Sequence, residues 1–153
     1  MTNLVVSNNR VPAMTSKAIA KVGRLEKFIL QHEQFVPDTD HVIHGGMYCR
    51  TIVLPGGMVL AGALIKVPTI LIVSGHVRVF LDNESVDIHG YRVLAASAIR
   101  KQAFLVFEDT VLTMIFTTDS DTVEACEEQF TDEADQLMSR WHEAVNTITI
   151  TGE

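Results

Sequence analysis

The sequence predicts a mostly β protein: a small barrel or sandwich with one helix before it and another after it. Between residues 48 and 118, short apolar segments alternate with glycine, proline and Asp-Asn turn signals, a spacing typical of such folds. Residues 15–32 and the segment after residue 120 carry apolar side chains at helical spacing instead. The 153 residues are enough for one compact domain with a sizeable core.

The first part of the chain, residues 1–43, is expected to form an arm and a helix. Thr15 or Ser16 is a suitable cap for a helix over residues 15–32. One stripe of that helix is apolar: Ile19, Val22, Leu25 and Ile29. The stretch "PDTDHVIHGG" then interrupts the pattern and is interpreted as a loop.

The second part, residues 44–118, is expected to be the barrel. Its strands are placed at 48–54, 58–65, 69–74, 76–81, 85–88, 91–95, 103–107 and 111–117. Gly75, Gly90 and the pair Glu108-Asp109 are interpreted as turns between strands, because these residue types favour turns. Arg50 is interpreted as a structural residue.

The third part, residues 119–153, opens with an acidic helix. Asp121 is a good N-cap, and Glu124 three residues later completes a capping box. A break near Thr131 is an alternative to one helix running to about residue 145. The apolar stripe of this segment is continuous: Val123, Cys126, Phe130, Ala134, Leu137 and Trp141.

Strict alternation of Thr and Ile in "TITIT" predicts a terminal strand with Ile148 and Ile150 on one face. A lone strand leaves backbone groups unpaired, so this one must join a sheet edge in its own barrel or in a neighbouring copy. The N-terminal "NLVV" has the same need.

Composition excludes several classes of function. The net charge of −7 gives a nucleic-acid role no overall support. No apolar run approaches the roughly 20 residues that span a bilayer, and "MTNLVVSNNR" lacks the pattern of a signal peptide. Cys49 and Cys126 form no C-x-x-C pair and are interpreted as reduced thiols. A cytoplasmic product is the default expectation.

Residues 44–118 resemble a cupin, a double-stranded β-helix. The matching stretches are "HGGMYCRTIVLPGGMVL", "IKVPTILIVSGHVRVF" and "FEDTVLTMIFTT", followed at once by the acidic helix. More narrowly, the chain is similar to small phage and prophage cupin-like proteins, and this resemblance implies the host cytoplasm or a virion as its location. The resemblance implies a jelly-roll barrel with an N-terminal helix, a C-terminal acidic helix and a short C-terminal strand.

The residues at the cupin ligand positions do not fit a metal. Between Gly57 and Gly75, where the family motif has His, His and Glu, this chain has Ala63, Ile65 and Thr69. These side chains cannot replace imidazole or carboxylate ligands. The second motif reads "AASAIRKQAF", and the late-His position falls on a phenylalanine. The resemblance therefore implies a vestigial pocket without metal or other cofactor, lined by Ala63, Ile65, Thr69, Phe104 and Phe107.

No catalytic residue is assigned, and the remaining histidines have plain interpretations. Metal-free cupins can be sugar epimerases, which need a His–Asp pair facing the cavity, and no inward strand position supplies one. His41 and His44 precede the first barrel strand, where they could form a metal site in the loop, but two histidines at this spacing are more often surface residues. His76 is expected on the outward face of a strand, and His89 in a turn beside Gly90.

Charge is distributed unevenly between the two helices. The first is basic, with Lys17, Lys21 and Arg24; the segment 119–135 is acidic and has no basic residue. They could meet within one subunit or between subunits, or simply be solvated faces. The candidate interaction residues are Lys17, Lys21, Arg24, Glu124, Glu127, Glu128, Ile148 and Ile150.

Two classes of function fit these features. The first is a non-catalytic structural or protein-interaction platform of phage type, acting as a homo-oligomer, with other phage structural proteins as partners in a virion. The alternative is a small-molecule-binding or metal-independent enzymatic cupin with an apolar pocket.

Overall fold

A computed structural model describes residues 9–81 and 83–153. Part of the N-terminal arm, including "NLVV", lies outside the described residues. In chain order the elements are β1 (Arg10–Val11), α1 (Ser16–Ile29), β2 (Thr39–His44), β3 (Met47–Leu54), β4 (Val59–Ala61), β5 (Thr69–Phe80), β6 (Ser85–Ala96), β7 (Ala103–Thr117), α2 (Val123–Phe130), η1 (Ala134–Gln136), α3 (Met138–Trp141), η2 (Glu143–Val145) and β8 (Asn146–Ile150). No helix in this part of the chain is long and apolar enough to cross a membrane.

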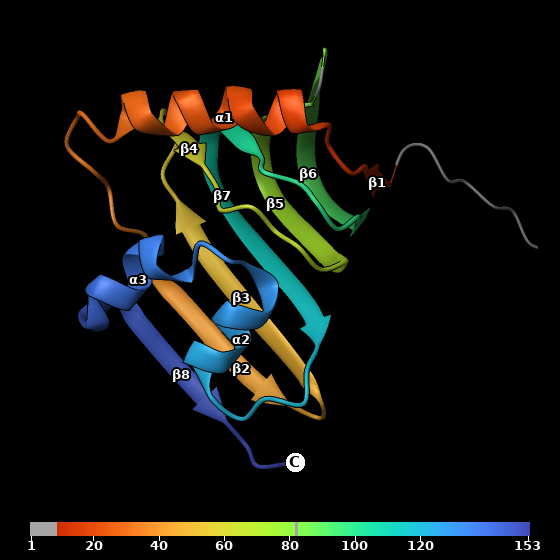
Figure 1. Ribbon diagram of the computed structural model, residues 1–153, viewed down its shortest axis with the longest axis vertical. Helices are drawn as coiled ribbons and strands as arrows, with labels where there is room; N and C mark the ends of the chain where they lie inside the picture. The colour runs from red at the N-terminus through yellow and green to blue at the C-terminus, as the bar shows by residue number, and fades with distance from the viewer. Residues whose placement is uncertain (1–8, 82) are drawn as a thin grey trace, which may run out of the picture.

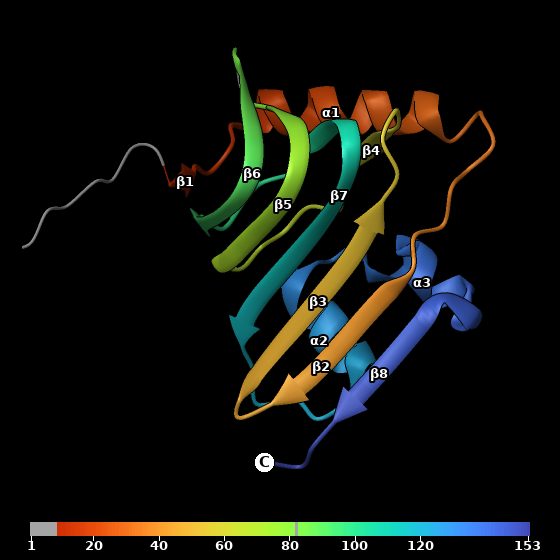
Figure 2. The ribbon, with the colours of Figure 1, turned by 180° about the vertical axis from the view of Figure 1, so that it is seen from behind.

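The strands form one curled sheet in the order β1-β6-β5-β7-β3-β2-β8, and β4 pairs with β7. The mostly β fold with helices near both ends is therefore confirmed. Strand β7 has two neighbours on one side, because residues 110–117 pair with β3 and residues 103–105 pair with β4. Helix α1 crosses one end of the sheet, whereas α2 and α3 lie over the face formed by β3, β2 and β8 (Figures 1 and 2).

Three of the expected turns lie inside long strands. Strand β5 continues through Gly75, β6 continues through Gly90, and β7 continues through Glu108-Asp109. At Gly75 the pairing of β5 with β7 shifts register, and φ is +149°. A bulge of this kind bends a strand and lets it continue. Gly75 therefore predicted the position of this irregularity but not its type.

The first helix agrees with its expected start. The Thr15 side chain accepts a hydrogen bond from the Ala18 amide, and the helix ends at Ile29. Ala18 and Val22 form a small buried cluster with Met14 and Ala103, which fixes α1 to the start of β7. The sheet interior next to it is filled by a larger cluster that includes Leu71, Val77 and Leu112.

The C-terminal segment is not one helix. The cap of α2 is Thr122 rather than Asp121, and the helix ends at Phe130, so the break at Thr131 is confirmed. Short turns follow, and they take Trp141 out of the phase of the apolar stripe. Trp141 is 71% exposed, and its indole N–H donates to the Asp135 carbonyl. The placement of Trp141 on the buried side of a continuous apolar stripe is therefore wrong.

The stretch interpreted as a loop before the barrel contains strand β2. β2 pairs antiparallel with β3 and parallel with β8 of the same chain. The terminal strand thus joins an edge of its own sheet, and no exchange between copies is needed to satisfy it. Thr149 and Val42 are partners in this pairing, and the interleaved Ile148 and Ile150 remain about half exposed.

Candidate functional site

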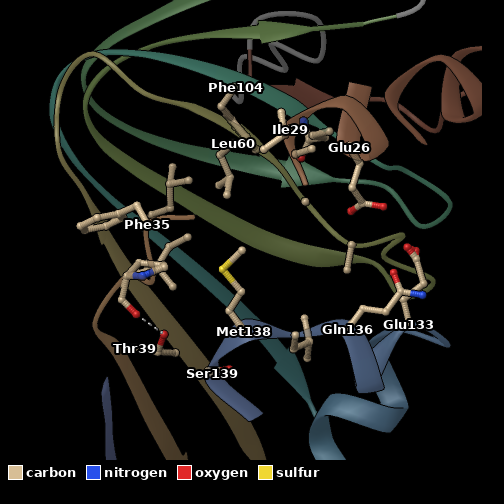
Figure 3. A pocket seen from close by; sticks show the side chains of 18 of the residues that line it. Glu26, Ile29, Phe35, Thr39, Leu60, Phe104, Glu133, Gln136, Met138 and Ser139 are labelled. Carbon is tan, nitrogen blue, oxygen red and sulfur yellow. Dashed lines mark hydrogen bonds between the residues drawn. The ribbon is translucent and has the colours of Figure 1, made fainter. Parts of the chain in front are cut away.

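A cavity of about 700 Å³ opens on the concave side of the sheet. Its walls come from the end of α1 and the loop after it, from β4, from the sheet interior, and from residues 133–139 (Figure 3). Most of the lining is apolar: Ile29, Phe35, Ile52, Leu60, Leu71, Phe104, Leu112, Met114, Leu137 and Met138. A few polar groups interrupt this lining, and they define the chemistry of the site.

The expected pocket residues divide between two faces. Ala63, Ile65 and Phe104 line the cavity. Thr69 is buried, with its hydroxyl turned to Arg100. Phe107 is outside: because Phe104 and Val106 alternate inward along β7, Phe107 faces out, and its place in the pocket lining is corrected.

Arg100 is the most buried large side chain of the cavity wall. It is 1% exposed and lies beside Ile65, with which its backbone forms a bridge. Its guanidinium donates to Thr69 Oγ1 at 2.7 Å, to the Ser97 carbonyl at 2.6 Å and to Gln102 Oε1 at 3.3 Å. These acceptors are all neutral, and no described carboxylate forms an ion pair with Arg100.

Burial lowers the pKa of Arg100 to about 10, which still leaves the side chain protonated at neutral pH. The cavity wall therefore holds a positive charge that no described protein group compensates. Such a charge is costly away from water. The residue before it is also strained, since Ile99 has a φ of 64°, a conformation rare for β-branched side chains.

Gln102 supplies a second unsatisfied group. Its side chain lines the cavity and is 6% exposed, and its amide Nε2 has no hydrogen-bond partner among the described residues. An orphaned buried N–H costs about 1–3 kcal/mol. Gln102 Oε1 is already used by Arg100, so the amide N–H groups are free to donate to a ligand.

Two of the three carboxylates that line the cavity are held by one lysine. Glu26 and Glu133 both line it, and the buried Lys101 ammonium lies 3.2 Å from Glu26 and 2.8 Å from Glu133. Lys101 thereby joins α1 and the segment after α2 to the start of β7. Because Glu26 and Glu133 share one ammonium and Glu33 also lines the cavity, these rim groups keep a net negative charge, and Arg100 is the most buried cation of the wall.

A second polar network forms the floor of the cavity. Arg50 donates to Glu127 Oε2 at 3.0 Å and to Ser139 Oγ at 2.8 Å, and Arg140 contacts the other oxygen of Glu127. Glu127 is 2% exposed, so its expected role on an exposed acidic face is corrected. The network fixes α2 and α3 to β3.

His41 belongs to this region and is not a surface residue. Its Nε2 lies 2.6 Å from Asn146 Oδ1 and its Nδ1 lies 2.7 Å from the Tyr48 hydroxyl. Asn146 Nδ2 donates to the Ser139 carbonyl, so its oxygen accepts from His41, and the Tyr48 hydroxyl donates to Nδ1. Burial lowers the pKa of His41 below its usual value, and burial raises that of Tyr48 to about 12.

The remaining interaction candidates lie on separate surfaces. Lys17, Lys21 and Arg24 are exposed on α1, and Glu124 and Glu128 are exposed on α2. No ion pair joins the two groups within the described residues. Ile148 and Ile150 are exposed on β8, away from the cavity.

No protein-family model matches the sequence, and no curated protein is similar enough to it to match. Solved structures with a similar fold carry cupin names. A cupin superfamily protein from Desulfitobacterium hafniense is 13% identical, with a TM-score of 0.46 over 76% of this chain and 100% of that one. A Cupin 2 conserved barrel domain protein from Salinispora arenicola is 12% identical, with a TM-score of 0.42 over 64% and 75%.

A third similar structure is the Cupin_2 domain of an XRE family transcriptional regulator from Enterobacter cloacae. It is 14% identical, with a TM-score of 0.38 over 46% of this chain and 80% of that one. Likeness at this level describes the fold and gives no activity. The narrower resemblance to phage proteins stays a prediction.

Sequence reasoning missed Arg100 and Gln102. Both lie in "AASAIRKQAF", which attracted notice for the proline, glycine and histidine that it lacks. The available signal was an arginine among small and apolar residues in a segment expected to be buried. Nothing in the local sequence indicates which carboxylates lie near it in space.

Proposed function

We propose that this protein binds a small molecule with an apolar body and an anionic oxygen group in the cavity. The observation that carries the proposal is Arg100, a buried cation on the cavity wall whose side-chain acceptors are all neutral. This is the second of the two functions that the sequence left open.

The polar group of the proposed ligand is inferred from two hydrogen-bond donors of the cavity wall, Arg100 and Gln102. A carboxylate provides two acceptor oxygens and a full countercharge, and hydrogen bonds of this charge-assisted kind are short and strong. One oxygen would accept from Arg100 and the other from Gln102 Nε2, an amide with no hydrogen-bond partner in the described part of the chain. A neutral alcohol would satisfy one donor and leave the charge uncompensated.

The apolar part of the proposed ligand is inferred from the side chains that line the cavity. Phe104, Leu60 and Met138 project into the same space from β7, β4 and α3 (Figure 3). A volume of about 700 Å³ is within the range of pockets that take small organic ligands. Binding is proposed rather than catalysis, because Lys101 holds Glu26 and Glu133, and Glu33, the third carboxylate of the lining, is exposed at the rim.

The interaction-platform function keeps one observation in its favour. The outward face of the sheet carries exposed apolar side chains on adjacent strands: Val53, Ile70, Tyr91, Val93 and Val111. A second copy of this chain is the occupant proposed for that face, which gives the expected homo-oligomer. Contact with phage proteins and a place in a virion stay predictions.

A cavity-filling variant tests the binding proposal. Titration of 1-anilinonaphthalene-8-sulfonate, an aromatic anion, into the native protein is expected to give one saturable site with enhanced fluorescence. Ala63→Trp places an indole in the cavity and is expected to abolish that site. Ala95→Trp makes the same change on the outward side of β6 and should leave the site intact. Equal binding by both variants would contradict the proposal.

A further inference from the structure

Three metal-binding side chains meet on the outward face of the sheet, away from the cavity. The ligand atoms of His76, His89 and Glu108 all lie within 4.8 Å of one another. They come from the three adjacent strands β5, β6 and β7. His76 is the register partner of both His89 and Glu108, so the backbone ladder holds the three side chains together.

We propose that these three side chains form a binding site for a divalent transition metal of the zinc class. Imidazole and carboxylate are ligands that zinc prefers, and three protein ligands leave a coordination position for water. The site is separate from the ligand positions of the barrel interior, where Ala63 and Ile65 stand, and it is independent of the proposed cavity function.

The irregular backbone at Gly75 creates this arrangement. Register shifts on both sides of His76 place its side chain opposite Glu108. The His76 amide donates to Thr110 Oγ1 at 3.1 Å, and that hydroxyl donates to the Glu108 carbonyl at 2.8 Å. One threonine thus fixes the backbone of two ligands, and sites built on strands are more rigid than sites on loops.

The side chains need only a small movement to bind. Bonds of 2.0–2.2 Å to one ion put tetrahedral ligand atoms about 3.3 Å apart. His89 Nε2 and Glu108 Oε1 are already 3.9 Å apart, and both side chains are exposed and free to rotate. The rings of His76 and His89 are stacked with centroids 4.5 Å apart, so a modest rotation would direct one nitrogen of each at a common point.

Neighbouring groups support one ligand without competing for the metal. Phe107 packs against the His76 ring at 4.7 Å between centroids. Asp87 lies 3.9 Å from His76 Nε2 and is held at 2.7 Å by Arg78. This distance is longer than a hydrogen bond, and a small movement of the His76 ring would let Asp87 accept from it, as outer carboxylates do for metal-bound histidines.

Zinc titration of the full-length protein without an affinity tag tests the site. With a chromophoric zinc chelator as competitor, the native protein is expected to bind one equivalent of zinc. His89→Ala and Glu108→Gln should each weaken binding at least about tenfold, a loss typical of damaged metal sites. His44→Ala, another exposed histidine on a strand, should leave the affinity unchanged.

Cobalt provides a second readout. Cobalt substitution should give visible absorption bands of a low-coordinate site in the native protein and not in His89→Ala. Failure of the native protein to compete with the chelator would overturn the proposal, as would unchanged zinc affinity in both ligand variants.

Since His89 and Glu108 are exposed, circular dichroism should show that both variants fold. Binding of the aromatic anion in the cavity should persist in them, which separates this test from that of the proposed function.

Discussion

Arg100 Nη2 donates a 2.7 Å hydrogen bond to Thr69 Oγ1, and Thr69 stands where the cupin resemblance places a glutamate ligand. A neutral hydroxyl at this position leaves the guanidinium with no countercharge from the described residues. The buried cation therefore lies in the wall of an apolar cavity. This hydrogen bond marks the polar end of the proposed anion site.

Gly75→Ala should destabilise the fold by about 3 kcal/mol or more, because it combines backbone strain with overpacking. Gly75 has a φ of +149°, and a Cβ added to it would lie 2.7 Å from Thr110 Cα. Gly90, its register partner, has a positive φ but open space, so Gly90→Ala should cost only the strain. Urea unfolding measures both, and an equal loss in the two variants would show that the contact with Thr110 is unimportant.

Stability should fall below pH 6.5 because His41 is buried in its neutral form. Its folded-state pKa is lowered, so the unfolded chain takes up a proton first as pH falls through 6.5. The stability that neutral His41 contributes is complete above that pH. Below it, this contribution to the free energy of unfolding decreases by at most about 1.4 kcal/mol per pH unit. His41→Gln should reduce this slope in unfolding free energy between pH 7 and 5. A slope unchanged by His41→Gln would refute the assignment.

Trp141→Ala should cost less than about 1.5 kcal/mol, the value of one hydrogen bond at an exposed site. Phe130→Ala, which truncates a fully buried ring, should cost about 3–5 kcal/mol. Trp141 is the one tryptophan of the chain, so native emission should be red-shifted and readily quenched by acrylamide. Blue-shifted, protected emission would mean that the ring is covered, either by its own chain or by another copy.

Self-association should depend on the outward sheet face rather than on β8. Val93→Glu places a charge in that apolar face and is expected to give monomers in light scattering. Val86→Glu changes another exposed valine of β6, on the opposite face, and should keep the oligomer. A chain ending at residue 145 should also keep it, because β8 pairs within its own chain. Monomers in the native protein would exclude the oligomer.

The sequence was most informative where one segment determines its own structure. The cap and apolar stripe of α1, the break after Phe130 and the alternating strand β8 all follow from local patterns. Glycines in β5 and β6 misled, because a glycine that allows a bulge has the same local signature as one that allows a turn.

The candidate sites were largely hidden from sequence reasoning because they depend on pairing. Ala63, Ile65 and Phe104 could be placed in the cavity from a family motif. The uncompensated charge of Arg100 depends on which acceptors surround it, and the His76 cluster depends on a register shift between β5 and β7. Neither property is local in the chain.

The most direct test of the central claim compares octanoate with octanol, which share an apolar body and differ in charge. Calorimetric titration of the native protein should show octanoate binding at least about tenfold more tightly, a difference of about 1.4 kcal/mol. Gln102→Glu keeps the size of the side chain and gives Arg100 a carboxylate partner. This variant should lose the preference for octanoate and still bind octanol. Equal affinity of the native protein for both ligands, or an undiminished octanoate preference in Gln102→Glu, would contradict the account.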